Sequence, residues 1–361
     1  MAGSTLVKHL PHGHLKATSK PETKAREAHF CIYQDSAKQL FGNCPELTLE
    51  LQDEEPLFHE ACVFFPSEND DHLFVTSSIL DRKGSKTIQI SLLVRGQNRS
   101  TWERKDIPGG DTLMANGAVN CPDMQSLLIC AQGNHDHIGG LVKMSAQSPY
   151  KTEHILTNYH GRQFNSVNDV VYAKDGSIWF TDPDYGVEQG FRPSPELPNH
   201  IYRFDEAIHD LRVVAEGFGK PNGLCFSPDE ETLYITDTDW VHGDGSIDPT
   251  RASHIHAYTV KMFHGAPFLT EKRMFAMADT GIPDGIKCDT EGRVYSGTGD
   301  GVSIWAPSGT LLAKIIVPGG CANFCFGRPG EMFILNETQF WVAKFHSDVQ
   351  GALLQDYFKQ H

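Results

Sequence analysis

The chain has 361 residues, with 31 Lys and Arg against 46 Asp and Glu, and a formal net charge of -15. Such an acidic chain is not expected to bind nucleic acid, which requires a basic surface. The net negative charge also disfavours an anionic substrate, unless a bound cation reverses the local electrostatic field.

Residues 1–27 are expected to form a polar N-terminal arm. This segment lacks the apolar stretch of a secretory signal, and no run in the chain is long enough to span a membrane. The nine cysteines include no CxxC pair, so free thiols in a reducing compartment are expected. The sequence therefore predicts a cytoplasmic protein without a membrane partner, whose residues 28–361 form one domain.

Short strand-like runs bounded by Gly, Pro, Asp and Asn dominate the chain from Phe58 onward. Six stretches share a polar residue, a short apolar strand, a tight turn and a second strand. Their first polar residues are Glu60, Asn116, Asn168, Asn222, Asp284 and Asn323. A repeat of roughly 40 to 60 residues with about four strands is typical of propeller blades. The sequence therefore predicts an all-β, six-bladed β-propeller, and a β-sandwich is the alternative.

The ends of the chain are expected to close the ring of blades. The apolar-alternating residues 47–51 precede the first unit, and the strand at 340–343 would otherwise leave an open edge. We expect these two segments to pair.

The turn positions predict where the polar residues lie. In the stretch 166–186 the turn centres near Asp175, so Asn168 and Asp182 should sit opposite one another in an antiparallel pair. The same construction places Asn222 opposite Asp237. If the first strand of each unit is innermost, these polar ends converge on a central channel.

Four of these positions suggest a metal site in the channel: Glu60, Asn168, Asn222 and Asp284. Two carboxylates and two carboxamides suit a hard divalent cation, and calcium is the expected ion, with zinc, magnesium and manganese as alternatives. A single Asn or Asp before a strand commonly caps a turn. Four such residues at equivalent places in a repeat favour a shared site.

Three stretches carry a family resemblance. SVNDVVYAKDGSIWFTDPDYG, KPNGLCFSPDEETLYITDT and IPDGIKCDTEGRVY resemble signature blades of the gluconolactonase/regucalcin (senescence-marker-protein) family, and residues 115–144 are similar to fungal lactonohydrolases. The resemblance implies a propeller that holds one catalytic divalent cation, usually calcium, and hydrolyses an intramolecular ester. It places the metal ligands at the four residues named above, and it implies that Asp284 assists the attacking water. The family's Glu-Gly-Pro is Glu60-Ala61-Cys62 here.

Further candidates surround the same end of the channel. His135 and His137 follow the second strand of their blade and are candidate general bases, or else members of an exposed loop. His59 should point away from the channel and be structural. Asp182 either supports a ligand or forms a turn into Pro183. Supporting or substrate-binding roles are predicted for Asn116, Asn134, Asp182, Tyr185 and Trp240.

The sequence thus predicts a metal-dependent lactonase acting on a small-molecule lactone. Two alternatives stay open: another ester or phosphoester hydrolase using the same site, and a non-catalytic calcium-binding interaction propeller.

Overall fold

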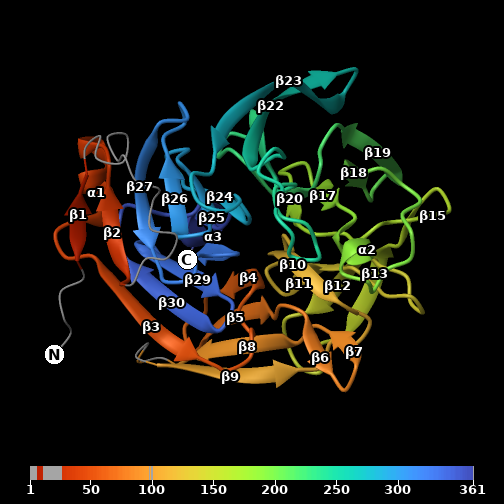
Figure 1. Ribbon diagram of the computed structural model, residues 1–361, viewed down its shortest axis with the longest axis horizontal. Helices are drawn as coiled ribbons and strands as arrows, with labels where there is room; N and C mark the ends of the chain where they lie inside the picture. Colours follow the sequence, from red (N-terminus) through yellow and green to blue (C-terminus); the bar gives the residue numbers. More distant parts are fainter. Residues whose placement is uncertain (1–5, 11–26, 97, 99–100, 361) are drawn as a thin grey trace.

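The computed structural model describes residues 6–10, 27–96, 98 and 101–360, and it arranges six antiparallel β-sheets in a ring (Figure 1). Each of these sheets is one blade, and the innermost strands are β4, β10, β16, β20, β24 and β28, which contact one another around the channel. The predicted six-bladed β-propeller is therefore confirmed.

Each blade starts with its inner strand at the channel and adds further strands outward. The strands are given from the channel outward. Blade 1 consists of β4 (Glu60–Phe65), β5 (Asp71–Thr76), β8 (Ile90–Arg95) and β9 (Trp102–Ile107). Blade 2 consists of β10 (Ala115–Asn120), β11 (Ser126–Ala131), β12 (Gly140–Ser145) and β13 (Thr152–Leu156), and blade 3 of β16 (Val170–Tyr172), β17 (Ile178–Asp182), β18 (His200–Asp205) and β19 (Asp210–Ala215). Blade 4 consists of β20 (Pro221–Phe226), β21 (Thr232–Asp237), β22 (His254–Phe263) and β23 (Ala266–Met277). Blade 5 consists of β24 (Ile286–Cys288), β25 (Val294–Thr298), β26 (Gly301–Trp305) and β27 (Leu311–Ile316). Blade 6 consists of β28 (Phe324–Phe326), β29 (Glu331–Asn336), β30 (Gln339–Lys344) and β3 (Glu46–Gln52).

The ring is closed by β3, which pairs antiparallel with β30 and places Leu47 opposite Ala343. This is the pairing expected from the sequence. Blade 5 gains two further strands, because β2 (His29–Ile32) pairs with β27 and β1 (Val7–His9) runs parallel to β2. Part of the segment expected to be a polar arm is thus a strand of blade 5, and most of the remainder lies outside the described residues.

Small elements decorate the blades. They are the hairpins β6–β7 (Leu80–Arg82, Ser85–Thr87) and β14–β15 (Asn158–Tyr159, Arg162–Gln163), the 3-10 turn η2 (Asp35–Ala37), and the helices α1 (Lys38–Phe41), α2 (Tyr185–Glu188) and α3 (Gln355–Gln360). Across the described ranges, no helix has both the length and the apolar character needed to cross a membrane.

The hydrophobic core lies in layers between neighbouring blades. Alternate residues of each strand point to opposite faces of its sheet, so every blade offers two apolar faces. Trp179 of blade 3 meets Phe226 of blade 4 edge to face at 5.4 Å, and Phe64 of blade 1 meets Phe333 of blade 6 at 5.1 Å. Because the core lies between the blades, residues that face the channel are not needed for core packing and can be polar.

A bulge interrupts three inner strands where their first polar residue stands. The register shifts between Ala61 and Val63 in β4, between Ala115 and Ala118 in β10, and between Pro221 and Leu224 in β20. An extra residue of this kind turns a side chain out of the regular alternation.

Because of the bulge in β20, the predicted pairing of Asn222 with Asp237 is wrong by one residue. Pro221, not Asn222, is opposite Asp237. In blade 3, by contrast, Val170 pairs with Phe180, as expected for a turn centred near Asp175.

Candidate functional site

Threonines hold the backbone of three polar residues at the channel. Each threonine sits on the second strand of one blade and donates its hydroxyl to a carbonyl of the next blade. The bonds run from Thr76 to Asn116 (3.1 Å), from Thr181 to Asn222 (2.7 Å) and from Thr236 to Asp284 (3.1 Å). The same donor at the same place in blades 1, 3 and 4 fixes each of these residues against the preceding blade.

Glycines after the polar residues allow the inner strands to approach closely. A Cβ on Gly117 would lie 2.5 Å from the Asn168 carbonyl oxygen, and one on Gly223 would lie 2.6 Å from the Asp284 carbonyl oxygen. Any side chain at these two positions would push neighbouring blades apart.

Blade 1 has no such glycine after Glu60. Ala61 and Cys62 both adopt a left-handed backbone, with φ of +63° at each. Residues other than glycine rarely adopt this conformation, which costs roughly 1–3 kcal/mol each and occurs where the surroundings enforce it. Despite this departure from the family pattern, Glu60 is buried, and its Oε2 accepts a hydrogen bond from Asn323 Nδ2 at 2.6 Å.

Asp182 supports the segment that leads into Asn168. Its carboxylate accepts the backbone N–H groups of Asn165 (3.0 Å) and Ser166 (2.9 Å), three and two residues before Asn168. In blade 4, Asp237 accepts the N–H groups of Gly219 and Lys220 in the same way ahead of Asn222. These bonds go to the backbone ahead of Asn168, and a role of Asp182 in supporting a metal ligand stays a prediction.

The carboxyl of Asp182 predicts a pH-dependent stability. Burial raises its pKa to about 7, against the opposing effect of the two N–H donors. The folded state therefore binds this proton more tightly than the unfolded state, so the stabilisation is full at low pH and is lost as the pH rises toward 7. In urea unfolding between pH 4 and 8, the native protein should lose stability relative to Asp182→Asn. The exposed Asp348→Asn is the control, and parallel curves for native protein and Asp182→Asn would contradict the prediction.

The carboxyl groups of Glu60, which is buried, and Asp284, which is half-buried, influence each other and, with the charged and polar groups that interact with them, form a cluster at the channel. The arrangement of the four predicted ligands around one ion stays a prediction. Burial and the Glu60 carboxylate raise the pKa of Asp284 well above its usual range, and burial and the nearby Asp169 raise that of Glu60. Asn168 Oδ1 and Asp284 Oδ1 are buried and accept no hydrogen bond within the described residues. Among those residues, Asp284 Oδ1 is the only carboxylate oxygen that is buried without a hydrogen-bond partner. Facing carboxylates and unpaired acceptor oxygens fit a hard cation.

The chain that is described has no cluster of three or more His, Cys, Asp or Glu side chains placed to hold a metal. The predicted set contains only two residues of these types, because its other two ligands are asparagines. A metal centre here would therefore depend on carboxamide oxygens as much as on carboxylates.

His59 was expected to be structural and to point away from the channel, and in the structure its side chain pairs with a residue of blade 6. Its Nδ1 lies 2.7 Å from Glu337 Oε1, on the segment after β29. Burial opposes its protonation, but the carboxylates of Glu337, Glu60 and Asp284 outweigh burial and raise its pKa to about 10. The direction of His59 relative to the channel stays a prediction.

Three other members of the cluster were not predicted as site residues. Asn323 stands at the polar position of the sixth unit, so the repeat itself could have identified it. Asp169 directly follows Asn168, and its carboxylate accepts the N–H of Val170 and that of Leu224 in the next blade. Glu337 had no signal, because it lies 278 residues from its partner His59.

The two candidate bases lie in an exposed loop. Asn134 Oδ1 accepts the N–H groups of Asp136 and His137 at 2.9 Å, and Arg192 donates to the Asn134 carbonyl at 3.1 Å. The contacts that the structure gives for His137 stay within the loop or join it to Arg192. The catalytic roles of His135 and His137 stay predictions.

The remaining predicted residues lie at the same end of the channel. The Tyr185 hydroxyl lies 2.5 Å from Thr238 Oγ1 and joins α2 to blade 4. Trp240 is half-buried in the loop after β21, and Asn116 is half-buried at the bulge of β10. Beside them, an open cleft of about 600 Å³ is lined by polar groups that include Asp184, Glu188 and Lys220.

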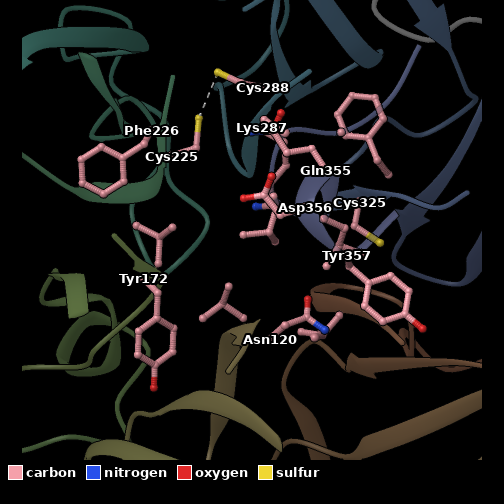
Figure 2. A pocket seen from close by; sticks show the side chains of 18 of the residues that line it. Asn120, Tyr172, Cys225, Phe226, Lys287, Cys288, Cys325, Gln355, Asp356 and Tyr357 are labelled. Carbon is pink, nitrogen blue, oxygen red and sulfur yellow. Dashed lines mark hydrogen bonds between the residues drawn. The ribbon is translucent and has the colours of Figure 1, made fainter. Parts of the chain in front are cut away.

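A second cavity, of about 390 Å³, occupies the opposite end of the channel (Figure 2). Its lining comes from the far halves of the six inner strands and from the C-terminal segment 351–357, and none of the four predicted ligands belongs to it. The channel thus has a polar, carboxylate-rich end and a largely apolar end.

The fold is that of a known class of propeller. A family model described as the SMP-30/Gluconolactonase/LRE-like region matches residues 90–336, and the chain belongs to this family. It is 32% identical over 319 residues to lactonohydrolase oryL of Aspergillus oryzae, covering 83% of this chain and 70% of the relative. It is 30% identical to a gluconolactonase of Zymomonas mobilis over 51% of each chain. A solved gluconolactonase structure from Xanthomonas campestris superimposes with a TM-score of 0.67 at 23% identity, over 89% of this chain and 99% of that one.

Proposed function

We propose that the protein is a lactonase that uses a divalent cation, calcium by preference, bound by Glu60, Asn168, Asn222 and Asp284. The observation that carries this proposal is the pair of buried, unpaired acceptor oxygens on Asn168 and Asp284, beside two carboxyl groups whose mutual repulsion a cation would relieve. The names of its relatives, lactonohydrolase and gluconolactonase, support lactones as the substrate class.

The residues of the cluster have separable tasks. When bound, a divalent cation polarises an ester carbonyl and lowers the pKa of water. Asp284 takes the proton of the attacking water, because its carboxylate has a buried oxygen, Oδ1, that accepts no hydrogen bond within the described residues. Asn168 and Asn222 supply neutral oxygens that do not cancel the charge of the cation.

The open polar cleft at the loops of blades 3 and 4, which none of the four proposed ligands lines, favours a lactone with several hydroxyl groups. Asp184, Glu188, Asn199 and Lys220 line it, and such side chains donate and accept hydrogen bonds to hydroxyls. We therefore propose sugar lactones before purely aliphatic ones.

Metal removal tests the proposal. The purified protein should contain about one equivalent of divalent cation by elemental analysis; a chelator should abolish acid release from a panel of sugar and aliphatic lactones, and added calcium should restore it. Full turnover by the metal-free protein would refute the metal requirement. Metal-dependent stability without turnover on any lactone, ester or phosphoester would instead indicate a non-catalytic propeller.

A further inference from the structure

The apolar end of the channel has the size and walls of a small-molecule site. Its cavity of about 390 Å³ lies within the range of roughly 300–1,000 Å³ that ligand pockets occupy. Val63, Val119, Leu224 and Phe226 contribute apolar wall from several different blades. Figure 2 shows side chains from several blades and the C-terminal segment arranged around it.

The C-terminal segment completes the wall. Ala352 N–H donates to the Cys288 carbonyl at 2.9 Å, and the Tyr357 hydroxyl donates to the Pro66 carbonyl at 3.1 Å. Residues 351–357 are thereby bound to blades 5 and 1 across this end of the channel. The cavity is consequently shaped by fixed backbone rather than by a loose tail.

Among the described residues, one cation that lines the cavity forms no close ion pair. Lys287 stands in the middle of β24 between Ile286 and Cys288, which pack into the core between blades 4 and 5, so alternation directs Lys287 toward the channel. Over the described ranges, its Nζ has no hydrogen bond and no carboxylate within 4.0 Å. The two most buried lysines differ in this respect, since Lys220 and Lys314 each pair with two carboxylates.

The other charged side chains of the cavity already have partners. Lys174 Nζ donates to the Pro228 carbonyl at 2.7 Å, Glu230 accepts the Lys174 N–H, and Asp356 pairs with Lys359. Burial opposes the charge of Lys287, but the Asp169 and Glu60 carboxylates outweigh it and keep its pKa raised. Lys287 therefore remains a cation that can still accept an anionic partner at short range.

We propose that this cavity binds a medium-chain carboxylate, with its head group on Lys287 Nζ and its hydrocarbon chain against Val171, Leu224 and Phe226. A charge-assisted hydrogen bond fixes the head group, and the chain removes apolar wall from water. None of the four proposed metal ligands lines this cavity, and octanoate binding can be measured without turnover, so the inference does not depend on the lactonase assignment.

Octanoate and octanol, titrated by calorimetry into the full-length protein, test the inference. Octanoate should bind more tightly than octanol to the native protein, by roughly ten- to a hundredfold, because the alcohol has the same chain but no charge. Lys287→Met should weaken octanoate by a similar factor and leave octanol unchanged. The matched control Lys174→Met removes a lysine at the same cavity that already has a partner, and it should change octanoate affinity less than about twofold.

Two results would overturn the inference. One is equal affinity of the native protein for octanoate and octanol, or binding of neither at millimolar concentration; this comparison needs no variant and holds even if Lys287→Met fails to fold. The other is unchanged octanoate affinity in a folded Lys287→Met, which would mean that Lys287 only balances the carboxylates of Asp169 and Glu60.

Discussion

Asp284→Asn should lower kcat/KM for lactone hydrolysis by roughly a hundred- to ten-thousandfold, the range that a general base contributes. The substitution keeps the shape of the side chain but removes its charge, and with it both the base and one of two carboxylates available to a cation. Calcium affinity, measured by calorimetry on protein freed of metal, should fall together with turnover.

Stability distinguishes loss of function from loss of fold in this variant. Glu60 raises the pKa of Asp284 because two carboxyl groups share a buried site. Metal-free Asp284→Asn should therefore be at least as stable as the metal-free native protein, since one of the two charges is gone. Asp348→Asn, at an exposed aspartate, is the control for a change of one charge. Retained metal with full turnover in Asp284→Asn would show that the site is misplaced.

Periodicity and turn chemistry were sufficient to predict the ring of blades. Regular spacing located the six inner strands, and the open edge at 340–343 required a partner, which β3 supplies through residues such as Leu47 and Thr48. Both arguments rest on local pattern and on unpaired backbone groups, which the sequence displays directly.

The details of the cluster depended on backbone irregularities that the sequence does not display. Ala61 and Cys62 do not favour a left-handed backbone, so nothing in their identity indicated the bulge that presents Glu60. The one-residue error at Asn222 has a similar cause in β20.

Contacts between distant parts of the chain also could not be predicted from the sequence. Glu337 meets His59 only because blade 6 closes against blade 1, and the C-terminal segment reaches the channel through Ala352 and Tyr357. Each of these contacts is decided by how the ring closes, and a pattern confined to one blade carries no information about it.

That closure carries the largest expected effect on stability. Arg95 of blade 1 is buried, with Nη1 2.6 Å from Glu331 Oε1 of blade 6 and Nη2 2.9 Å from Asp71 Oδ2, and its guanidinium lies 4.6 Å from the Trp102 ring centre. Arg95→Met should lower the free energy of unfolding by about 3–5 kcal/mol, because Glu331 is left buried without its cation. Asp71 keeps a second partner in Arg328, at 2.7 Å.

A double substitution distinguishes the ion pair from the packing of the arginine. Arg95→Met combined with Glu331→Met removes both charges, so its loss in urea unfolding should be clearly smaller than the sum of the two single losses. Additive losses would mean that the pair does not hold blades 1 and 6 together. Arg82→Met is the matched control, because Arg82 pairs with Glu55 at an exposed site where an ion pair contributes about 0–1 kcal/mol. A loss for Arg95→Met no larger than that of Arg82→Met would contradict the role of this buried pair in closing the ring.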